Sequence, residues 1–537
     1  MTKKNAVRSP NAQNLLELSN AQKCERIQAC STGDNKKPDG CVECQEKLWV
    51  SFFFDGTGQN RIVDKLKEKL SNPARLFETH PSRENEGIYA YYYSGVGTPF
   101  TEDINTGKHE IRDSELIGGG LGWGGDVRLD LASKQLEKTV RDNPGRKKIY
   151  IAIFGFSRGA ALSRFFANRI IKLCQVQNGV LMFQGKPLVI AFMGLFDTVA
   201  SFAPSTNLGG ENLDVKPWVK KCIHMVAAHE ARIFFPLSSI RTTSGYDSNG
   251  YIEYVYPGVH TDIGGGYPPY TSTITEESQW RGNELASIPL REMYKHAIAT
   301  GVPFLPIDEI LNDPKLERLF KATPQALVRY NNYINEVSAS GPLEKQTAEH
   351  RKVMAHWWGH RHTKEVDPEY ARLQKEVDAF LNESPAENAW KTADAYSHLT
   401  ERKTKIDALI EKRNHVAYSS DRIGFEVNLL RARAAVRGKD RGDEWLKRLQ
   451  HMFDRYTGGN RYSKLKLKEI RPQDIAILRP LDEHETQYLN AYSTVKLSPV
   501  AIEFFDKDLH DSAAGFAGEK IFLYRYFRSR RYLDELS

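Results

Sequence analysis

The sequence lacks the features that mark a membrane-spanning or signal-bearing protein. No stretch approaches the roughly 18 consecutive apolar residues that a spanning helix needs. The first residues, MTKKNAVRSPNAQNLLELS, contain no apolar run long enough for a signal peptide. We therefore expect synthesis in the cytoplasm, and any export by a route other than general secretion.

The sequence also lacks a strong excess of charge of either sign. Its 75 basic and 68 acidic residues leave a net charge of +7 over 537 residues. This mild balance favours approach to anionic phosphate or lipid surfaces, but no nucleic-acid-binding motif accompanies it. We expect no nucleic-acid partner. With 40% hydrophobic and 27% charged residues, the composition is typical of a soluble globular protein with room for several domains.

Cysteine is scarce, with six residues in the chain. Cys174 and Cys222 lie in apolar stretches, which is typical of inert core thiols. The other four fall in a polar N-terminal extension, residues 1–45: Cys24, Cys30, Cys41 and Cys44. Their spacing, which ends in Cys-x-x-Cys, suits a structural zinc ion, two disulfides or reduced thiols, and the sequence leaves these alternatives open.

Apolar segments alternate with helical patterns between residues 46 and 275. Buried strands are predicted at residues 48–54, 88–93, 148–154, 188–196 and 251–256, and helices at 127–140 and 158–173. Such alternation indicates a mostly parallel sheet with helices on both faces. We therefore predict an α/β fold of the α/β-hydrolase type, with its catalytic core in residues 46–275.

Beyond residue 275 the sequence becomes highly charged and helical in pattern. We predict that residues 276–475 form a large helical insertion or cap, and that the more strand-like and aromatic residues 476–537 rejoin the core. Aromatic and basic residues recur in the cap, at HWWGHRH (356–362), at Trp390 and from Trp445. They suit contact with a lipid surface, although packing between helices is the ordinary role of each tryptophan.

Residues 155–159, Gly-Phe-Ser-Arg-Gly, form a G-x-S-x-G pentapeptide. It follows a predicted strand directly and precedes a predicted helix, which is the context of a nucleophile elbow. The two flanking glycines allow the tight turn that exposes Ser157 at the end of its strand. We predict that Ser157 is a nucleophile, although an ordinary glycine-flanked turn has the same pattern.

A serine nucleophile needs a histidine base and a carboxylate that orients it. Asp197 ends a predicted strand and His260 closely follows another, in the chain order Ser, Asp, His that this fold requires. We predict these two as the acid and the base. His510 is a rival base and Asp262 a rival acid, although a structural role in a turn suits both.

The turn after the first predicted strand, DGTGQN, offers backbone N–H groups near the same edge of the sheet. We predict that Gly56 and Thr57, together with the N–H of Arg158 at the helix start, form the oxyanion hole. The turn lacks the lysine of a P-loop.

Five motifs occur in an order that resembles the GxSxG-bearing first family of type VI secretion phospholipase effectors. They are FFFDGTGQN, YYYSGVGT, GFSRGAALSR, GLFDTVAS and YPGVHTDIGGGY, and they cover residues 48 to about 270, with an echo at HDS near residue 510. The resemblance implies a triad of Ser157, Asp197 and His260 and hydrolysis of membrane phospholipids without a cofactor. It also implies delivery by a secretion spike protein into the periplasm of a rival bacterium, and a cognate immunity protein.

Three functions therefore compete. The first is an antibacterial phospholipase A, the second an esterase or thioesterase on soluble substrates, and the third a membrane- or partner-binding protein with a vestigial hydrolase core. The intact Ser, Asp, His order favours an enzyme.

Overall fold

The computed structural model describes most of the chain's first 362 residues and two stretches near its C-terminus. The described residues are 6–12, 18–31, 46–98, 100–101, 110–111, 124–200, 213–230, 232, 235–242, 245–246, 250–267, 284–362, 427, 481–510 and 530. Within this part, no helix is both long and apolar enough to cross a membrane.

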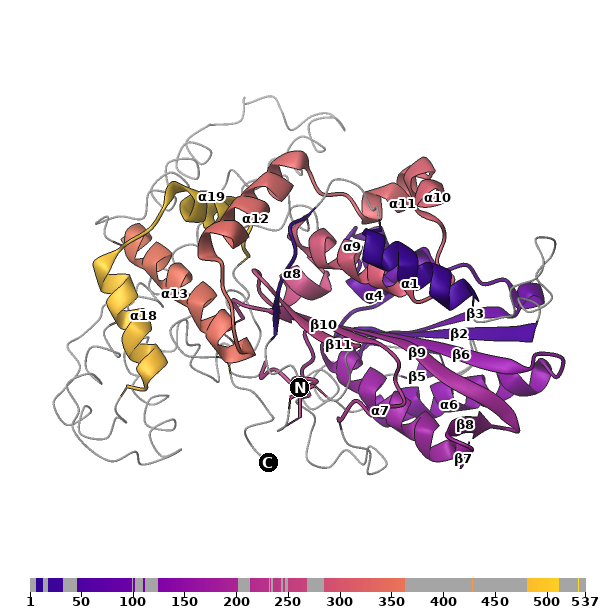
Figure 1. Ribbon diagram of the computed structural model, residues 1–537. Helices are drawn as coiled ribbons and strands as arrows, with labels where there is room; N and C mark the ends of the chain where they lie inside the picture. Colours follow the sequence, from indigo (N-terminus) through magenta and orange to yellow (C-terminus); the bar gives the residue numbers. More distant parts are fainter. Residues whose placement is uncertain are drawn as a thin grey trace, which may run out of the picture.

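A mostly parallel β-sheet lies at the centre of the fold, with helices packed on it (Figure 1). Its strands follow the spatial order β1 (Val7–Arg8), β11 (Tyr251–Tyr256), β10 (Cys222–Ala227), β9 (Lys186–Phe196), β6 (Lys148–Phe156), β2 (Lys47–Phe54) and β3 (Ile88–Tyr93). Every neighbouring pair along this path is parallel. A short hairpin, β7 (Gln175–Gln177) and β8 (Val180–Phe183), adds antiparallel strands beside β9, and β4 (Phe100–Thr101) pairs with β5 (Glu110–Ile111) separately. The predicted mostly parallel sheet is confirmed.

Alternating side chains of the central strands supply two apolar cores. On β2, Phe53 joins one cluster, whereas Phe52 and Phe54 join the other, and all three are fully buried. On β6, Phe154 lies in the first cluster and Ile153 in the second. Strands with both faces covered are continuous apolar runs, which is why these segments were recognisable in the sequence.

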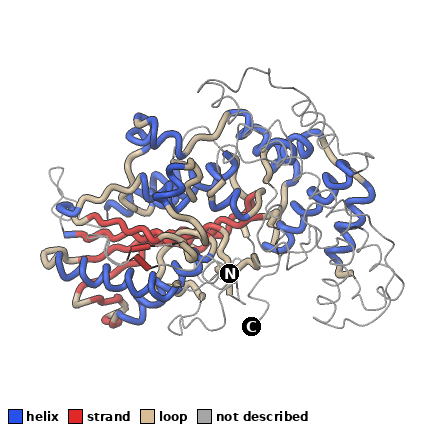
Figure 2. The backbone as a smooth tube through the Cα atoms, turned by 180° about the vertical axis from the view of Figure 1, so that it is seen from behind, coloured by secondary structure: helices blue, strands red, loops and turns tan. Residues whose placement is uncertain are grey.

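Helices cover both faces of the sheet (Figure 2). On one face lie α6 (Gly125–Asp142) and α7 (Arg158–Leu173); on the other lie α1 (Asn20–Ser31), α4 (Asn72–Glu78) and α9 (Glu284–Ala299) (Figure 1). Shorter elements are α3 (Arg61–Leu66), η1 (Glu84–Glu86), α8 (His260–Gly264), α10 (Ile307–Asn312) and α11 (Pro314–Leu319).

Four helices form a bundle to one side of the sheet (Figure 1). They are α12 (Pro324–Val337), α13 (Leu343–His362), α18 (Glu483–Thr494) and α19 (Pro499–Lys507). The described part of residues 476–537 is thus largely helical; residues 511–529 and 531–537 lie outside the described residues, so strand-like structure there stays a prediction. Ala501, Phe504 and Phe505 are fully buried, and their spacing of three and four places them on one helical face.

The tryptophans of HWWGHRH belong to the core, so the structure bears out packing between helices, the ordinary role of a tryptophan, and not direct contact with lipid. Trp357 is fully buried and Trp358 is 3% exposed. The Trp357 ring stacks on Phe505, and its Nε1 donates a 2.8 Å hydrogen bond to Asp506. Trp390 and the segment from Trp445 lie outside the described residues.

Candidate active site

Ser157 stands at a sharp turn between β6 and α7. Its backbone has φ 58° and ψ −125°, a conformation that non-glycine residues rarely adopt. The turn is fixed by a 3.0 Å hydrogen bond from the Ser157 N–H to the Phe196 carbonyl and by one from the Val199 N–H to the Ser157 carbonyl. The serine therefore sits at the first turn of α7, where the helix dipole favours negative charge.

The two glycines of the pentapeptide are required by close backbone approach, as the sequence predicts. A Cβ atom on Gly159 would lie 2.3 Å from the carbonyl oxygens of both Phe54 and Asp55. A Cβ atom on Gly155 would lie 2.4 Å from Ser163 Oγ. The end of β2 is therefore pressed against the start of α7, which brings the DGTG turn next to Ser157.

Asp197 follows β9 directly, one strand away from the serine. Phe156 and Phe196 are register partners in the β6–β9 pair, so the chain positions that follow them, Ser157 and Asp197, leave the sheet side by side. Asp197 also has a positive φ, 42°. Its Oδ1 accepts a 2.9 Å hydrogen bond from the Ala227 N–H, which fixes the side chain at the end of β10.

His260 begins α8 and lies against Asp197 and against Phe156, the residue that precedes Ser157. Its Nδ1 is 2.6 Å from Asp197 Oδ2. Its ring centroid is 4.6 Å from that of Phe156, the residue before Ser157. Its backbone N–H donates to Glu230 Oε2 at 3.1 Å. With Nδ1 bound to the carboxylate, Nε2 is the ring nitrogen left to exchange a proton.

Burial shifts the pKa values of both members of this pair. Burial alone would raise the pKa of Asp197, but the Arg530 guanidinium and the hydrogen bond from His260 outweigh it and hold that pKa well below its usual range. Burial lowers the pKa of His260 below its ordinary value, and Asp197 offsets only part of this effect. The pair therefore favours a carboxylate beside a neutral imidazole, the resting state that a general base requires.

Arg530 is a site residue that the sequence did not reveal. Its Nη1 and Nη2 donate to Asp197 Oδ1 and Oδ2, each at 2.7 Å, across 333 residues. No local motif marks it, because Arg530 belongs to the basic stretch RSRRYL, which resembles any solvated surface segment.

The rival base and the rival acid are paired with each other. His510 Nδ1 lies 2.5 Å from Asp262 Oδ1. Asp262 Oδ2 also accepts a 3.0 Å hydrogen bond from the Val259 N–H at the start of α8, and Tyr267 stacks on the His510 ring. The structure thus brings His260 to Asp197 and places His510 against the helix that carries His260.

The predicted oxyanion donors adjoin the elbow, but one of them is already engaged. A Cβ atom on Gly56 would lie 2.5 Å from the Phe156 ring, so the turn abuts the elbow. The Gly56 N–H donates a 2.7 Å hydrogen bond to Asp55 Oδ1, which leaves Thr57 as the candidate donor from this turn. Burial raises the pKa of Asp55 to about 6. The candidate donor from the helix remains the N–H of Arg158, the first residue of α7.

The described residues contain no group of three or more His, Cys, Asp or Glu side chains placed to hold a metal ion. Cys24 is exposed and unbonded. The side chain of Cys30 and all of Cys41 and Cys44 lie outside the described residues, so their use in zinc binding or disulfides stays a prediction. Burial raises the pKa of Cys222, as expected of an inert core thiol.

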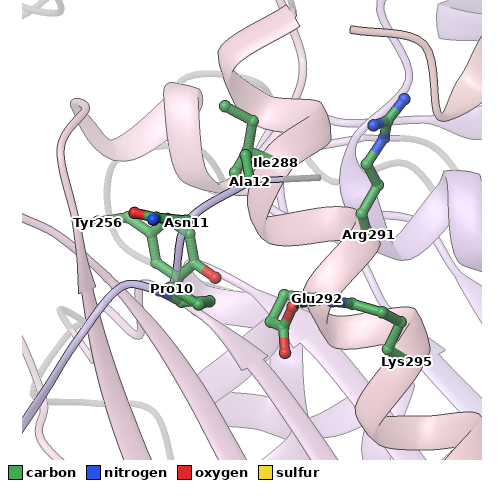
Figure 3. Close-up of a pocket in the computed structure, with 8 residues that line it drawn as sticks. All are labelled: Pro10, Asn11, Ala12, Tyr256, Ile288, Arg291, Glu292 and Lys295. Atoms are coloured by element: carbon green, nitrogen blue, oxygen red, sulfur yellow. Dashed lines mark ion pairs between the residues drawn. The ribbon is translucent and has the colours of Figure 1, made fainter. Parts of the chain in front are cut away.

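A small pocket lies apart from these residues, between the N-terminal segment, β11 and α9 (Figure 3). It is lined by Pro10, Asn11, Ala12, Tyr256, Ile288, Arg291, Glu292 and Lys295. Lys295 and Glu292 form an ion pair within α9. None of the predicted triad residues lines this pocket, so it is distinct from the candidate active site.

Comparisons with known proteins relate the chain to one family model and to solved structures. A model of the catalytic domain of Tle1-like phospholipase effectors of type VI secretion matches residues 50–184 and 175–296. No curated protein matches the sequence. The crystal structure of an uncharacterized protein from Pseudomonas aeruginosa is similar at 20% identity and a TM-score of 0.63, over 99% of this chain and 85% of that one. It shows the same fold.

A second solved structure, the Tle1 effector bound to the VgrG spike of a type VI secretion system, is 19% identical. The match covers 63% of this chain and 86% of that one, with a TM-score of 0.38, which is too low to carry a structural argument.

Proposed function

We propose, from the match of residues 50–296 to the model of the Tle1-like catalytic domain of type VI secretion phospholipase effectors, that this chain is a serine phospholipase A. In this proposal it hydrolyses acyl ester bonds of membrane phospholipids as an antibacterial effector. The match supports a lipase or esterase, and the serine mechanism and the phospholipase A specificity are the finer part of the proposal.

One observation carries the mechanism: the 2.6 Å contact between His260 Nδ1 and Asp197 Oδ2, beside a serine held at positive φ. A serine hydroxyl attacks an ester only when a base accepts its proton. An oriented, neutral imidazole next to a buried carboxylate is such a base, because the carboxylate stabilises the imidazolium that forms. His260 and Asp197 lie 63 residues apart in the sequence, and their contact supports the proposal.

In the proposed reaction, Ser157 Oγ attacks the acyl carbonyl while His260 Nε2 takes its proton. The developing oxyanion is stabilised by backbone N–H groups at the start of α7 and in the neighbouring turn, from Arg158 and Thr57. His260 then returns the proton to the departing lysophospholipid. Water, activated by the same imidazole, releases the fatty acid from Ser157. No metal or cofactor takes part in this scheme.

The partners follow from the family and are proposed on that ground. We expect a type VI secretion spike protein as the carrier, membrane phospholipids in the target-cell periplasm as substrate, and an immunity protein that protects the producing cell. The matched family model is that of type VI secretion effectors, and this is the ground for a carrier of that kind.

Fatty-acid release from phospholipid vesicles tests the proposal. The parent chain should release fatty acid, and Ser157→Ala should reduce turnover by about 10⁴-fold or more without changing the melting temperature by more than a few degrees. Ser163→Ala is a matched control, because this serine lies on the same helix and donates to backbone carbonyls at 2.9 and 3.1 Å. It should remain active.

The alternatives give different results in the same experiment. If the parent chain hydrolyses a short-chain soluble ester but releases no fatty acid from vesicles, the result would favour an esterase on soluble substrates over a phospholipase. A parent chain that hydrolyses neither substrate would favour a binding protein, and a folded Ser157→Ala variant with full turnover would remove the serine from the mechanism.

A further inference from the structure

The carboxylate of Asp197 has a partner that a catalytic triad does not require. Arg530 binds both of its oxygens, at 2.7 Å each. Together with His260 and the Ala227 N–H, the arginine surrounds a carboxylate that is fully buried. A bidentate guanidinium fixes both the position and the plane of a carboxylate, so Arg530 determines where Oδ2 lies for His260.

Arg530 is itself held in place from several sides. Its Nε donates to the Phe235 carbonyl at 2.9 Å, and its Nη1 also donates to the Ala227 carbonyl at 3.2 Å. The Phe235 ring lies 4.8 Å from the His260 ring. The Arg530 side chain is only 2% exposed. Exposed ion pairs contribute little, but removing one partner of a buried pair leaves an uncompensated charge.

Among the described residues, several titratable groups near the pair form ion pairs of their own. Three further pairs face Asp197 and His260 or lie on adjoining segments: Glu230–Arg232, Asp262–His510 and Glu253–His224. Arg232 lowers and Glu230 raises the pKa of His260. Loss of Arg530 would therefore leave one unmatched negative charge at Asp197, directly beside the imidazole.

We propose that Arg530 is a positioning residue of the active site, which holds Asp197 charged and oriented so that His260 can act as the base. This inference rests on the serine mechanism proposed above. Arg530 acts through Asp197 and does not need to touch substrate. The inference implies that a site built from Ser157, Asp197 and His260 is completed by Arg530, which comes 270 residues after His260 in the sequence.

The physical effect of Arg530 has a definite sign. Burial favours a protonated Asp197, and the arginine is the largest influence that opposes it. Without the arginine, a proton would bind more readily either to Asp197 or to His260, which titrate as a coupled pair. Both routes keep the site in an inactive, protonated form up to a higher pH. A purely structural role for Arg530 would not move this limb of the pH profile.

The test is kcat/KM against pH for the full chain on a short-chain soluble ester. For Arg530→Gln we expect the acid limb to move to higher pH by about one unit or more. We also expect the plateau value to fall by about 10- to 100-fold, because Asp197 is no longer fixed. For Arg530→Lys, which keeps the charge but not the fork, the acid limb should stay close to that of the parent while the plateau falls.

Arg329→Gln is the matched control. Arg329 forms a comparable buried bidentate pair with Asp508, at 2.6 and 2.7 Å, between α12 and the end of α19. It should lower the melting temperature without moving the acid limb. An acid limb for Arg530→Gln that coincides with that of the parent, or that moves no more than that of Arg329→Gln, overturns the inference.

Two further outcomes are separable. If Arg530→Gln does not fold, Arg530→Lys decides: an unchanged kcat/KM at every pH would contradict positioning by the bidentate fork. Ser157→Ala, assayed alongside, reports on the mechanism itself. Its full activity would remove the premise, whereas an inactive Ser157→Ala with a normal Arg530→Gln would remove the role of Arg530 alone.

Discussion

The backbone at Ser157 should store strain that a glycine would relieve. Its φ of 58° lies where a Cβ atom crowds the backbone, and such conformations cost about 1–3 kcal/mol. Ser157→Ala keeps the Cβ atom and therefore the strain, whereas Ser157→Gly removes both. The glycine also increases the entropy of the unfolded chain, which costs about 0.4–1 kcal/mol. The difference predicts that Ser157→Gly is more stable than Ser157→Ala by about 1 kcal/mol, although both are inactive.

The assay is thermal unfolding of both variants, followed by urea unfolding for the free-energy difference. In a domain of 150–250 residues a change of about 1 kcal/mol moves the melting temperature by about 2–4 °C, and a smaller shift is expected for this longer chain. Ser338 provides the matched control, because it is exposed, ends α12 at φ 45° and lies outside the proposed site. Ser338→Gly should be more stable than Ser338→Ala by a similar amount and remain active.

The reasoning fails if the glycine at position 157 is no more stable than the alanine while the glycine at 338 is. That pattern would mean that the turn relaxes when the hydroxyl is lost, so that the positive φ is not imposed by the surrounding strands. A stabilised Ser157→Gly would instead show that the fold sustains an unfavourable conformation at the residue assigned as nucleophile, as expected when strain serves a reaction.

Three other outcomes are expected. His260→Ala should lose nearly all ester hydrolysis, whereas His510→Ala, which breaks the pair with Asp262, should retain much of it with a lower melting temperature; an inactive His510→Ala alone would reverse the assignment of the base. Because burial lowers the pKa of His260 below its usual value of about 6.5, kcat/KM should hold as pH falls through 6.5 and decline only below it, and an acid limb at or above 6.5 would contradict this. Trp357→Ala should cost about 3–5 kcal/mol of stability, so that vesicle and soluble-ester hydrolysis fall together with the melting temperature, whereas a selective loss of vesicle hydrolysis would restore a lipid-contact role to Trp357 and Trp358.

The site residues that could be predicted from the sequence are those whose roles leave a local sequence pattern. Gly155 and Gly159 flank Ser157 because backbone atoms from β2 and α7 approach too closely for any Cβ, and such a constraint leaves a readable pattern. Asp197 and His260 each follow an apolar strand, and parallel strands bring their carboxyl ends to one edge of a sheet. The turn at Ser157 and the contact between His260 and Asp197 could therefore be predicted from local sequence patterns and the order of the residues along the chain.

Features that depend on contacts between distant parts of the chain could not be predicted from the sequence. The pairing of Arg530 with Asp197 spans 333 residues, and nothing in the neighbouring residues distinguishes this arginine from a solvated one. The burial of Trp357 depends on Phe505, from a helix more than a hundred residues later. An aromatic and basic cluster has the same composition whether its aromatic face meets a membrane or another helix, so composition could not choose between them.

Contacts from the C-terminal residues His510 and Arg530 also help to hold the strained backbone conformations at the site. Ser157 and Asp197 both have positive φ, and each unfavourable conformation persists only where the surroundings determine it fully. Backbone hydrogen bonds tie both residues to the sheet, and the side chain of Asp197 is held by Arg530 and His260. The loop of His260 is held in turn by Asp262 and its partner from the C-terminal segment. One contact from His510 thus holds the helix that carries His260, and another from Arg530 holds the carboxylate that His260 contacts. We therefore expect the positions of Asp197 and His260 to depend on His510 and Arg530, although both lie hundreds of residues away along the chain.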